Sequence, residues 1–397
     1  MSWLGWVIFV VALLFSVMLH ETGHFVAAKK FGMKVTQYFV GFGTTLWSIV
    51  RGETEYGIKV LPFGGFVKIV GMTSMDEVDP EDEPRSFRRH PAWQRLIVLF
   101  AGSFMHFVLA LVLLFLVAGG IGLESTSNTS SNLGISTCVP ANAKAYNDNS
   151  CVGSHQRSPA QVAGMKPGDT IVSFDGKPVS TWTGLGAVIR ATPAGKSVPV
   201  VVERSGQRLT LHVTLAKVKG VSGSLLGVDE ATTFDRYNPI RAVTYAGSTF
   251  GSVLTGSVKV IGELPSAIPH LFAKNRSSTS AGQVTSVVGA GEITGDVVSS
   301  NVGWQVKVDY VLLIMASLNI FVGAFNLLPL LPLDGGHIAV VLYEAIRSRW
   351  ARLRHRPDPG LVDMTKLVPV SMGVFAILVF FGLVLILADL VNPVKIT

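Results

Sequence analysis

The sequence predicts a polytopic α-helical membrane protein, with four transmembrane helices, a membrane-associated β-hairpin region and one inserted extracytoplasmic α+β domain. The first observation is composition: 49% of the 397 residues are hydrophobic and 15% are charged, whereas soluble domains carry about 25% charged residues. The second is that four stretches hold the roughly 20 apolar residues that a membrane-crossing helix needs. The third is a compact run of strand and turn patterns at residues 158–217. These observations argue against a purely soluble enzyme and exclude a disordered chain.

The first predicted span occupies residues 1–28, and its second half carries His20, Glu21 and His24. Trp3 lies near its outer end, where interfacial aromatic residues are common. A cleaved signal peptide is the alternative, but the segment lacks a basic start and a small-residue cleavage site. We therefore expect a retained transmembrane helix.

Residues 29–92 are predicted to form a β-hairpin region followed by a linker. Apolar and polar residues alternate over 33–71, as in paired strands, and the break at 62–65 reads Pro-Phe-Gly-Gly. The hairpin lies either at membrane depth or on the cytoplasmic surface, and the pattern leaves both open. At membrane depth it must pack on protein, and its free edge could accept a strand from another chain.

The second span is predicted at residues 93–118, and an extracytoplasmic linker follows at 119–157. This linker is rich in Ser, Thr, Asn and Gly and contains both cysteines of the chain, Cys138 and Cys151. Outside the cytoplasm a disulfide between them is favoured, because that environment is oxidising. Two free thiols are the alternative, and two cysteines cannot build a zinc–cysteine framework.

Residues 158–217 predict a small domain of strand, Asp-Gly turn, strand, helix and two further strands. The whole stretch 158–217, which begins Ser158-Pro159-Ala160 and contains the Asp175-Gly176 turn, resembles a PDZ domain of the bacterial protease type. That resemblance implies a module that binds extended peptides by strand addition. The triplet Gly184-Leu185-Gly186 is similar to the carboxylate-binding loop of such domains, but it falls on the predicted helix and we treat it as coincidence.

Residues 218–306 are predicted to be an interfacial amphipathic region, because Arg241 and Lys259 interrupt a moderately apolar stretch. The third span is predicted at 307–334, a cytoplasmic helix with a basic loop at 335–366, and the fourth span with the C-terminus at 367–397. Two prolines, Pro329 and Pro332, break the end of the third span.

The distribution of basic residues predicts the orientation of the spans. Residues 29–95 contain ten Lys and Arg, and the loop after the third span contains six, whereas residues 119–307 contain sixteen over a much longer stretch. Since basic loops stay in the cytoplasm, the inserted domain and both termini should lie outside. This accounts for the net charge of +7. No basic stripe with interleaved aromatic residues points to nucleic acid.

A zinc-binding site is predicted by the segment His20-Glu21-Thr22-Gly23-His24, which is an H-E-x-x-H motif on a predicted helix. Residues i and i+4 face the same way, so both imidazoles can bind one Zn²⁺ while Glu21 reaches a metal-bound water. Three ionisable residues inside a span are costly without a partner, which Zn²⁺ would supply. Solvated residues at a protruding helix end are the alternative.

A catalytic zinc needs a third protein ligand, and Asp334 is the candidate. It follows Pro332 at the predicted cytoplasmic end of the third span, and the H-E-x-x-H motif lies at the same end of the first span. Gly335 and Gly336 would allow close backbone approach. Asp334 could instead be the N-cap of the next helix, and His337 is a weaker competing ligand.

Taken together, the H-E-x-x-H span, the PDZ-like domain between the second and third spans and the N-x-x-P…D-G pattern resemble the site-2 protease family, in particular bacterial regulator of sigma-E proteases. The resemblance implies an intramembrane zinc endopeptidase that cleaves single-span membrane proteins, such as trimmed anti-sigma factors or remnant signal peptides. It implies Zn²⁺ on His20, His24 and Asp334, Glu21 as catalytic acid and base, and Asn326 as a residue that holds the substrate strand. It further implies the bacterial cell (inner) membrane and an upstream site-1 protease acting on the same substrate.

Two departures from the family pattern stand out. Leu331 occupies the usual position of the second proline, which here is Pro332, although the spacing from Asn326 to Asp334 is kept. His106 stands in the second span where family members often have Asn, and we leave it out of the ligand set. The competing classes are a non-catalytic PDZ-containing membrane adaptor and a zinc-coupled transporter, for which no membrane-embedded repeat is visible.

Overall fold

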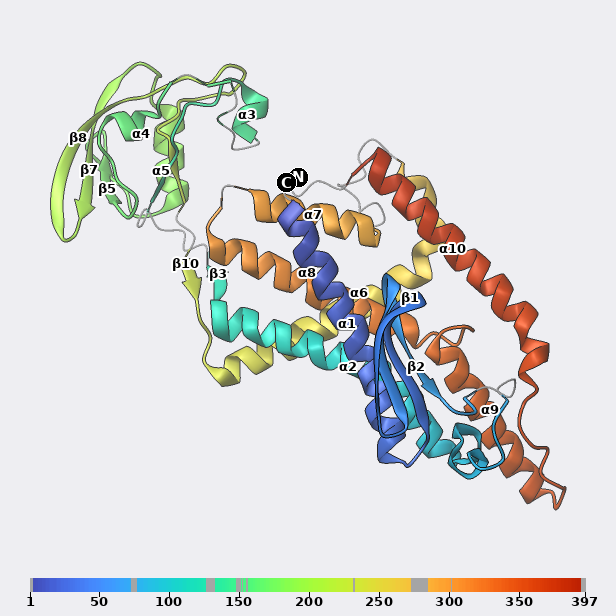
Figure 1. Ribbon diagram of the computed structural model, residues 1–397. Helices are drawn as coiled ribbons and strands as arrows, with labels where there is room; N and C mark the ends of the chain where they lie inside the picture. The colour runs from blue at the N-terminus through green and yellow to red at the C-terminus, as the bar shows by residue number, and fades with distance from the viewer. Residues whose placement is uncertain are drawn as a thin grey trace. The chain divides into compact units, whose positions relative to one another are not determined.

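The computed structural model describes residues 3–72, 77–125, 133–147, 151, 153–154, 156–230, 233–272, 285–300 and 302–393. It divides into two compact units, which we describe separately (Figure 1). One contains Met1–Gly122 together with Arg236–Ile396, and the other contains Leu123–Asp235.

In the described part of the first unit, four helices are long and apolar enough to cross a bilayer, as the sequence predicts. They are α1 (Trp3–Lys30), α2 (Ala92–Phe115) with its π-helical continuation η3 (Leu116–Ile121), α8 (Trp304–Asn326), and α10 (Val368–Val391) with the preceding turn η5 (Met364–Leu367). Pro91 precedes α2, where a missing N–H costs nothing. Lys29 and Lys30 end α1, where cations complement the helix dipole.

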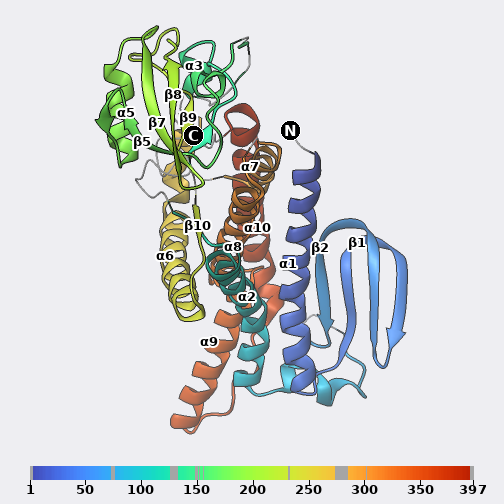
Figure 2. The same ribbon diagram turned by 90° about the vertical axis from the view of Figure 1, so that its left-hand side faces the viewer.

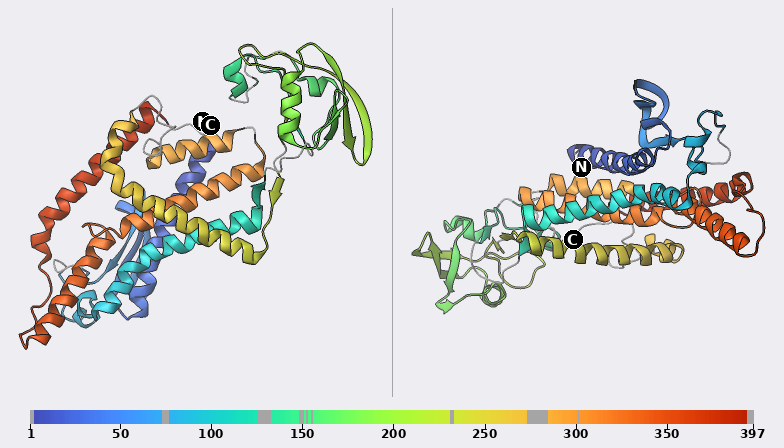
Figure 3. Two further views of the ribbon diagram at one scale, coloured as in Figure 1. Left: turned by 180° about the vertical axis from the view of Figure 1, so that it is seen from behind. Right: turned by 90° about the horizontal axis from the view of Figure 1, so that it is seen from below.

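The helices pack through small and aliphatic side chains. Ala110 of α2 and Ala316 of α8 share a buried cluster with Ala246 of α6 (Pro239–Leu271), and the three helices run side by side (Figure 3). The helix α7 (Val287–Ser299) packs against α1 on the side that also faces α8 (Figure 2), and its approach leaves no room for a side chain at Gly5. An interfacial position for α6 remains a prediction.

The hairpin region consists of two long strands, β1 (Val35–Arg51) and β2 (Thr54–Ile69). Both strands bend, because residues 37–40 pair with 65–68 on one side and with 55–58 on the other. Residues 45–51 pair in turn with 54–59. The result is a sheet of four short segments. Two turns, η1 (Glu83–Arg85) and η2 (Phe87–Arg89), follow it along the chain.

This sheet packs directly on α1 (Figure 2). The Tyr38 hydroxyl lies 2.8 Å from the Thr22 hydroxyl and donates to the Met18 carbonyl at 3.0 Å. A Cβ atom on Gly65 would lie 2.9 Å from the backbone oxygen of Phe39 and 2.5 Å from the Met18 sulfur, so a larger residue here would crowd both the neighbouring strand and α1. The hairpin therefore lies along a candidate membrane span, on the stretch of α1 that carries the H-E-x-x-H motif.

Ion pairs hold the base of the hairpin. Glu53, in the turn between the strands, accepts hydrogen bonds from Arg85 at 2.6 Å and from Lys29 at 2.5 Å. The hydrogen bond from Arg85 outweighs partial burial and, with Lys29, lowers the pKa of Glu53 to about 2. The end of α1, the hairpin turn and the linker are thereby tied together.

The second unit is built on a four-stranded sheet in the order β6-β5-β7-β8. Its strands are β5 (Thr170–Phe174), β6 (Lys177–Pro178), β7 (Ser197–Arg204) and β8 (Gln207–Thr214). The helices are α3 (Ala143–Asn147), α4 (Pro159–Val162) and α5 (Trp182–Ala191), and two further short pairs join β3 (Leu123–Ser125) to β10 (Thr233–Asp235) and β4 (Gly134–Ile135) to β9 (Val228–Asp229).

The second unit extends beyond the 158–217 domain that the strand pattern suggested. Leu133 and Leu226, which flank that range, are buried in the same core as Ile171 and Leu185. Cys138 and Cys151 form a disulfide with Cα atoms 5.8 Å apart, which decides between the two alternatives for these cysteines.

Candidate metal centre

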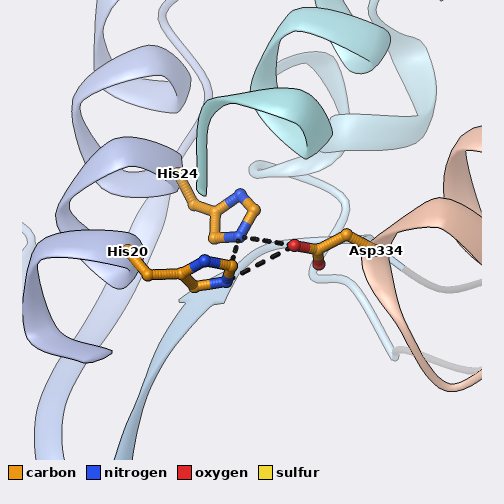
Figure 4. Close-up of side chains that lie close together, drawn as sticks. All are labelled: His20, His24 and Asp334. Carbon is orange, nitrogen blue, oxygen red and sulfur yellow. Dashed lines mark hydrogen bonds and ion pairs between the residues drawn. The ribbon is translucent and has the colours of Figure 1, made fainter. Parts of the chain in front are cut away.

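His20 and His24 lie one helical turn apart on α1 and are both buried, at 8% and 4% exposure. Both side chains point to the same side, toward the start of α9 (Asp334–Leu353) (Figure 4). Gly23, between the two histidines, lets α2 pack closely against this part of α1. A Cβ atom at Gly23 would lie only 2.7 Å from the carbonyl carbon of Ala101 in α2.

Asp334 joins the two histidines. Its Oδ2 atom lies 3.4 Å from Nε2 of His20 and 3.3 Å from Nε2 of His24, and the two Nε2 atoms are 3.1 Å apart. Asp334 is the first residue of α9 and makes no capping hydrogen bond, while Leu333 occupies the N-cap position. The alternative role as a helix cap is therefore not realised.

Two glycines let α9 begin at this point. A Cβ atom on Gly336 would lie 2.6 Å from the carbonyl carbon of Leu330, and one on Gly335 would lie in contact with the backbone of Leu327 and Leu328. The broken end of α8 thus folds back against the start of α9, and this fold brings Asp334 to the histidines.

The three donor atoms fit a zinc ion. Zinc–nitrogen and zinc–oxygen bonds of about 2.0–2.2 Å in a tetrahedron imply ligand atoms roughly 3.3–3.6 Å apart, close to the observed 3.1, 3.3 and 3.4 Å. Among the described residues, these three form the one group of His, Cys, Asp and Glu close enough to share a metal. Two imidazole nitrogens and a carboxylate oxygen converging in a buried place require a proton or a cation between them.

The orientation of His24 suits a ligand. Its Nδ1 atom lies 2.7 Å from the carbonyl oxygen of Val98 in α2, and since a carbonyl only accepts, Nδ1 carries the proton. The lone pair then resides on Nε2, which faces His20 and Asp334. Metal-binding histidines are commonly oriented by such a hydrogen bond.

The other predicted residues do not belong to this group of three. Glu21 is half-buried on α1, with its carboxylate beside the backbone of Val67 in β2. Asn326 is the half-buried last residue of α8. His337 lies one turn after Asp334 on α9, outside the group of three.

A buried polar network next to the cluster was not predicted. Asn319 of α8 accepts hydrogen bonds from the Ser16 hydroxyl at 2.5 Å and from His106 Nδ1 at 2.7 Å. The His106 ring lies 4.9 Å from the His20 ring, centre to centre. The signal was present in the sequence, because Ser16, His106 and Asn319 are polar residues within apolar spans, where they are costly.

Comparisons with known proteins agree with this geometry. The family model described as Peptidase family M50 matches residues 8–357. Zinc metalloprotease Rip1 of Mycobacterium tuberculosis is 37% identical over 410 aligned residues, which cover 98% of each chain. Zinc metalloprotease Rip1 of Mycolicibacterium smegmatis is also 37% identical, over 99% of this chain and 98% of that one.

Proposed function

Because this chain belongs to peptidase family M50, the site-2 protease family, we propose that it cleaves single-span membrane proteins within the bilayer at a zinc ion held by His20, His24 and Asp334. The chain is a multi-pass zinc metalloprotease, which sets aside the adaptor and transporter classes. The observation that carries the proposal is the triangle of two Nε2 atoms and one Oδ2 atom with sides of 3.1–3.4 Å. Catalytic zinc sites use three protein ligands of this kind and keep one position open.

In this proposal, Glu21 carries out the proton transfers. Zinc at the triangle would supply Lewis-acid polarisation of the scissile carbonyl and would acidify the attacking water. Glu21 follows His20 on α1 and lies outside the group of three donors, and the charges of His24 and Asp334 act on its carboxylate. It accepts the proton of the water and then returns it to the leaving amine.

The sheet edge beside Glu21 suits an unwound substrate. A helical substrate hides its peptide bonds in its own hydrogen bonds and must unwind before cleavage. Residues 65–68 of β2 pair with 37–40 on one side, and in the described part of the chain no strand pairs with their other side. An added substrate strand would hydrogen bond there, next to Val67 and hence next to Glu21. Asn326 would help to hold that strand.

Cleavage of a model single-span substrate, already trimmed outside the membrane, tests the proposal. The purified full chain in detergent should cut it, and 1,10-phenanthroline or Glu21→Gln should stop cutting. Glu263→Gln, at an exposed position of α6, is the matched control and should cut like the wild type. Cleavage that survives Glu21→Gln, or zinc content that His24→Ala leaves unchanged, would refute the assignment of these residues.

The second unit supports a PDZ-like role in capturing peptide ends. A cavity of about 90 Å³ lies between α5 and the segment 224–228, lined by Trp182, Ile189, Arg190 and Leu226 among others. Along its wall, the backbone N–H groups of Leu226 and Gly227 donate to no acceptor among the described residues. Unpaired N–H groups next to an arginine suit a C-terminal carboxylate, such as the one that a first cut outside the membrane exposes.

A size filter over the active site is the competing role of this unit. The variant Arg190→Gln, at an exposed position that lines the cavity, separates the two roles. If the cavity beside α5 captures new C-termini, this variant should cleave the trimmed substrate more slowly, and the untrimmed substrate should remain uncleaved. If the unit acts as a filter, trimmed substrate should be cut at the wild-type rate. Val162→Ser, at an exposed site outside the cavity, is the control.

The charge distribution along the chain bears on its orientation in the membrane. The density of basic residues in 29–95 and 335–366 supports cytoplasmic loops on that side, and therefore an extracytoplasmic second unit in a bacterial cell membrane. The disulfide between Cys138 and Cys151 agrees with an oxidising compartment. Anti-sigma factors trimmed by a site-1 protease are the substrate class that fits this arrangement.

A further inference from the structure

A buried ion pair links α2 to α9 at a distance from the metal triangle. Arg95 Nη1 donates to Glu344 Oε2 at 2.8 Å, and the two residues are 8% and 6% exposed. Removing two charges from water is costly, and apolar residues of similar size often stabilise a protein equally well. Stability alone therefore does not explain why a buried ion pair joins these two helices.

The pair connects the two helices that determine where the ligands sit. Arg95 lies one turn before Val98, whose carbonyl oxygen orients His24. Glu344 lies ten residues after Asp334 in the same helix, about 15 Å along its axis at 1.5 Å per residue. Val98 and Val341 pack in one buried cluster between these positions. A shift of α9 along α2 would move Asp334 away from the histidines.

The start of α9 has little regular structure to hold it. The chain reaches Asp334 through residues 327–333, after α8 has ended at Asn326. The second oxygen of Glu344 accepts a hydrogen bond from the Val362 backbone at 2.8 Å, so the same carboxylate also anchors the segment leading to η5. The Glu344 side chain thus joins α9 both to α2 and to the segment that precedes η5 and α10.

We propose that Arg95 and Glu344 are positioning residues that set the register of α9 against α2 and thereby the affinity of the site for zinc. The inference rests on the ligand set of the proposed function. It assigns the pair no contact with substrate or metal. Weakening the pair should loosen Asp334 relative to His20 and His24, and so weaken metal binding.

Zinc affinity of the full-length protein in detergent, measured by competition with a chromophoric chelator, tests this. Arg95→Met and Glu344→Gln should each raise the Kd for Zn²⁺ by about tenfold or more, the usual effect of disturbing groups that orient ligands. The exchanged pair Arg95→Glu/Glu344→Arg should recover most of the affinity. Lys34→Met, which breaks the 2.6 Å pair with Asp82 outside α9, should leave the Kd unchanged.

Wild-type Kd values in folded Arg95→Met and Glu344→Gln would overturn the inference, as would a folded exchanged pair that binds zinc no better than the single variants. Should a single variant not fold, the exchanged pair alone decides, by a Kd near or far from the wild type. If His24→Ala leaves the Kd of the wild type unchanged, the ligand set itself is wrong and the inference falls with it. Loss of affinity in His24→Ala with no loss in the Arg95 and Glu344 variants refutes the positioning role alone.

Discussion

Gly102 of α2 faces His24 of α1 so closely that a Cβ atom on the glycine would lie in contact with Nε2 of the imidazole. The same Cβ atom would lie 2.6 Å from Cε1 of His20. Gly102 therefore packs directly against the histidine pair, and even the methyl group of an alanine at this position would displace at least one donor nitrogen.

Gly102→Ala is expected to abolish zinc binding and cleavage. Alanine favours a helix by about 1 kcal/mol over glycine, so α2 itself should tolerate the change, and the loss should come from the blocked histidines. Metal analysis of the purified variant is the measurement. Gly382→Ala, where a Cβ atom on α10 meets nothing within 4 Å, should keep a full complement of zinc. A fully loaded Gly102→Ala protein would contradict the geometry.

Asn319→Leu is expected to destabilise the first unit. The change removes the acceptor shared by Ser16 and His106 in a buried place, at a cost of roughly 1–3 kcal/mol. The thermal unfolding temperature in detergent should fall, and zinc occupancy should fall less. Thr255→Val is the control, because the Thr255 hydroxyl is exposed and bonds its own helix. Equal unfolding temperatures for wild type and Asn319→Leu would show that the network contributes nothing.

Replacing both cysteines by serine is expected to loosen the second unit alone. The disulfide closes a loop across a sequence separation of 13, and such a link contributes about 3 kcal/mol. Hydrogen exchange of peptides from 156–230 should accelerate, while peptides from α1 and α2 should exchange as before. Reduction of the wild type should reproduce the shift, and reductant should not affect the variant. Unchanged protection after reduction would rule out a stabilising role.

The second unit should lose stability in acid because of Asp169. Burial alone would raise the pKa of this carboxyl, but hydrogen bonds from Arg204 and from the Lys166 backbone hold the pKa below its ordinary value. The bonds therefore stabilise the folded state above the unfolded pKa of about 4 and lose this effect as the pH falls through the lower folded value.

Asp169→Asn is the variant that isolates this effect. It should be less stable than the wild type at neutral pH, and the difference should shrink as the pH drops below about 4. Thermal unfolding at a series of pH values is the measurement. Asp175→Asn, which alters an exposed pair with Lys196, should show little pH-dependent difference. If the stability difference between wild type and Asp169→Asn stays constant as the pH falls, the predicted loss of this stabilisation in acid is wrong.

The metal triangle could be predicted because its signals are local. His20 and His24 share a helix face by spacing alone, and Asp334 follows a proline break at the matching end of another span. The Ser16–His106–Asn319 network could not be assembled in the same way. Its members come from three helices, and nothing in a single sequence indicates which faces of those helices meet.

Strand pairing between distant segments was likewise not predictable from the sequence. Alternation over 33–71 predicted a hairpin, but the bend that lets residues 37–40 pair on both sides depends on contacts between distant residues. The strands β4 and β9, which lie outside the predicted 158–217 domain, are two residues long each and pair across more than ninety positions. Strands so short carry no periodicity that could be recognised.

The second unit begins and ends on paired strands, since β3 lies against β10. In the helical unit, the backbone N–H of Tyr237 donates to the carbonyl of Ala118 at 2.9 Å, so the chain leaves η3 and reaches α6 at neighbouring points. A tight turn could bridge that gap. The helical unit would therefore stay continuous if the second unit were removed at this junction, so whole modules can be inserted or exchanged there, and a regulatory domain could be acquired during evolution without any alteration of the helices that carry His20, His24 and Asp334.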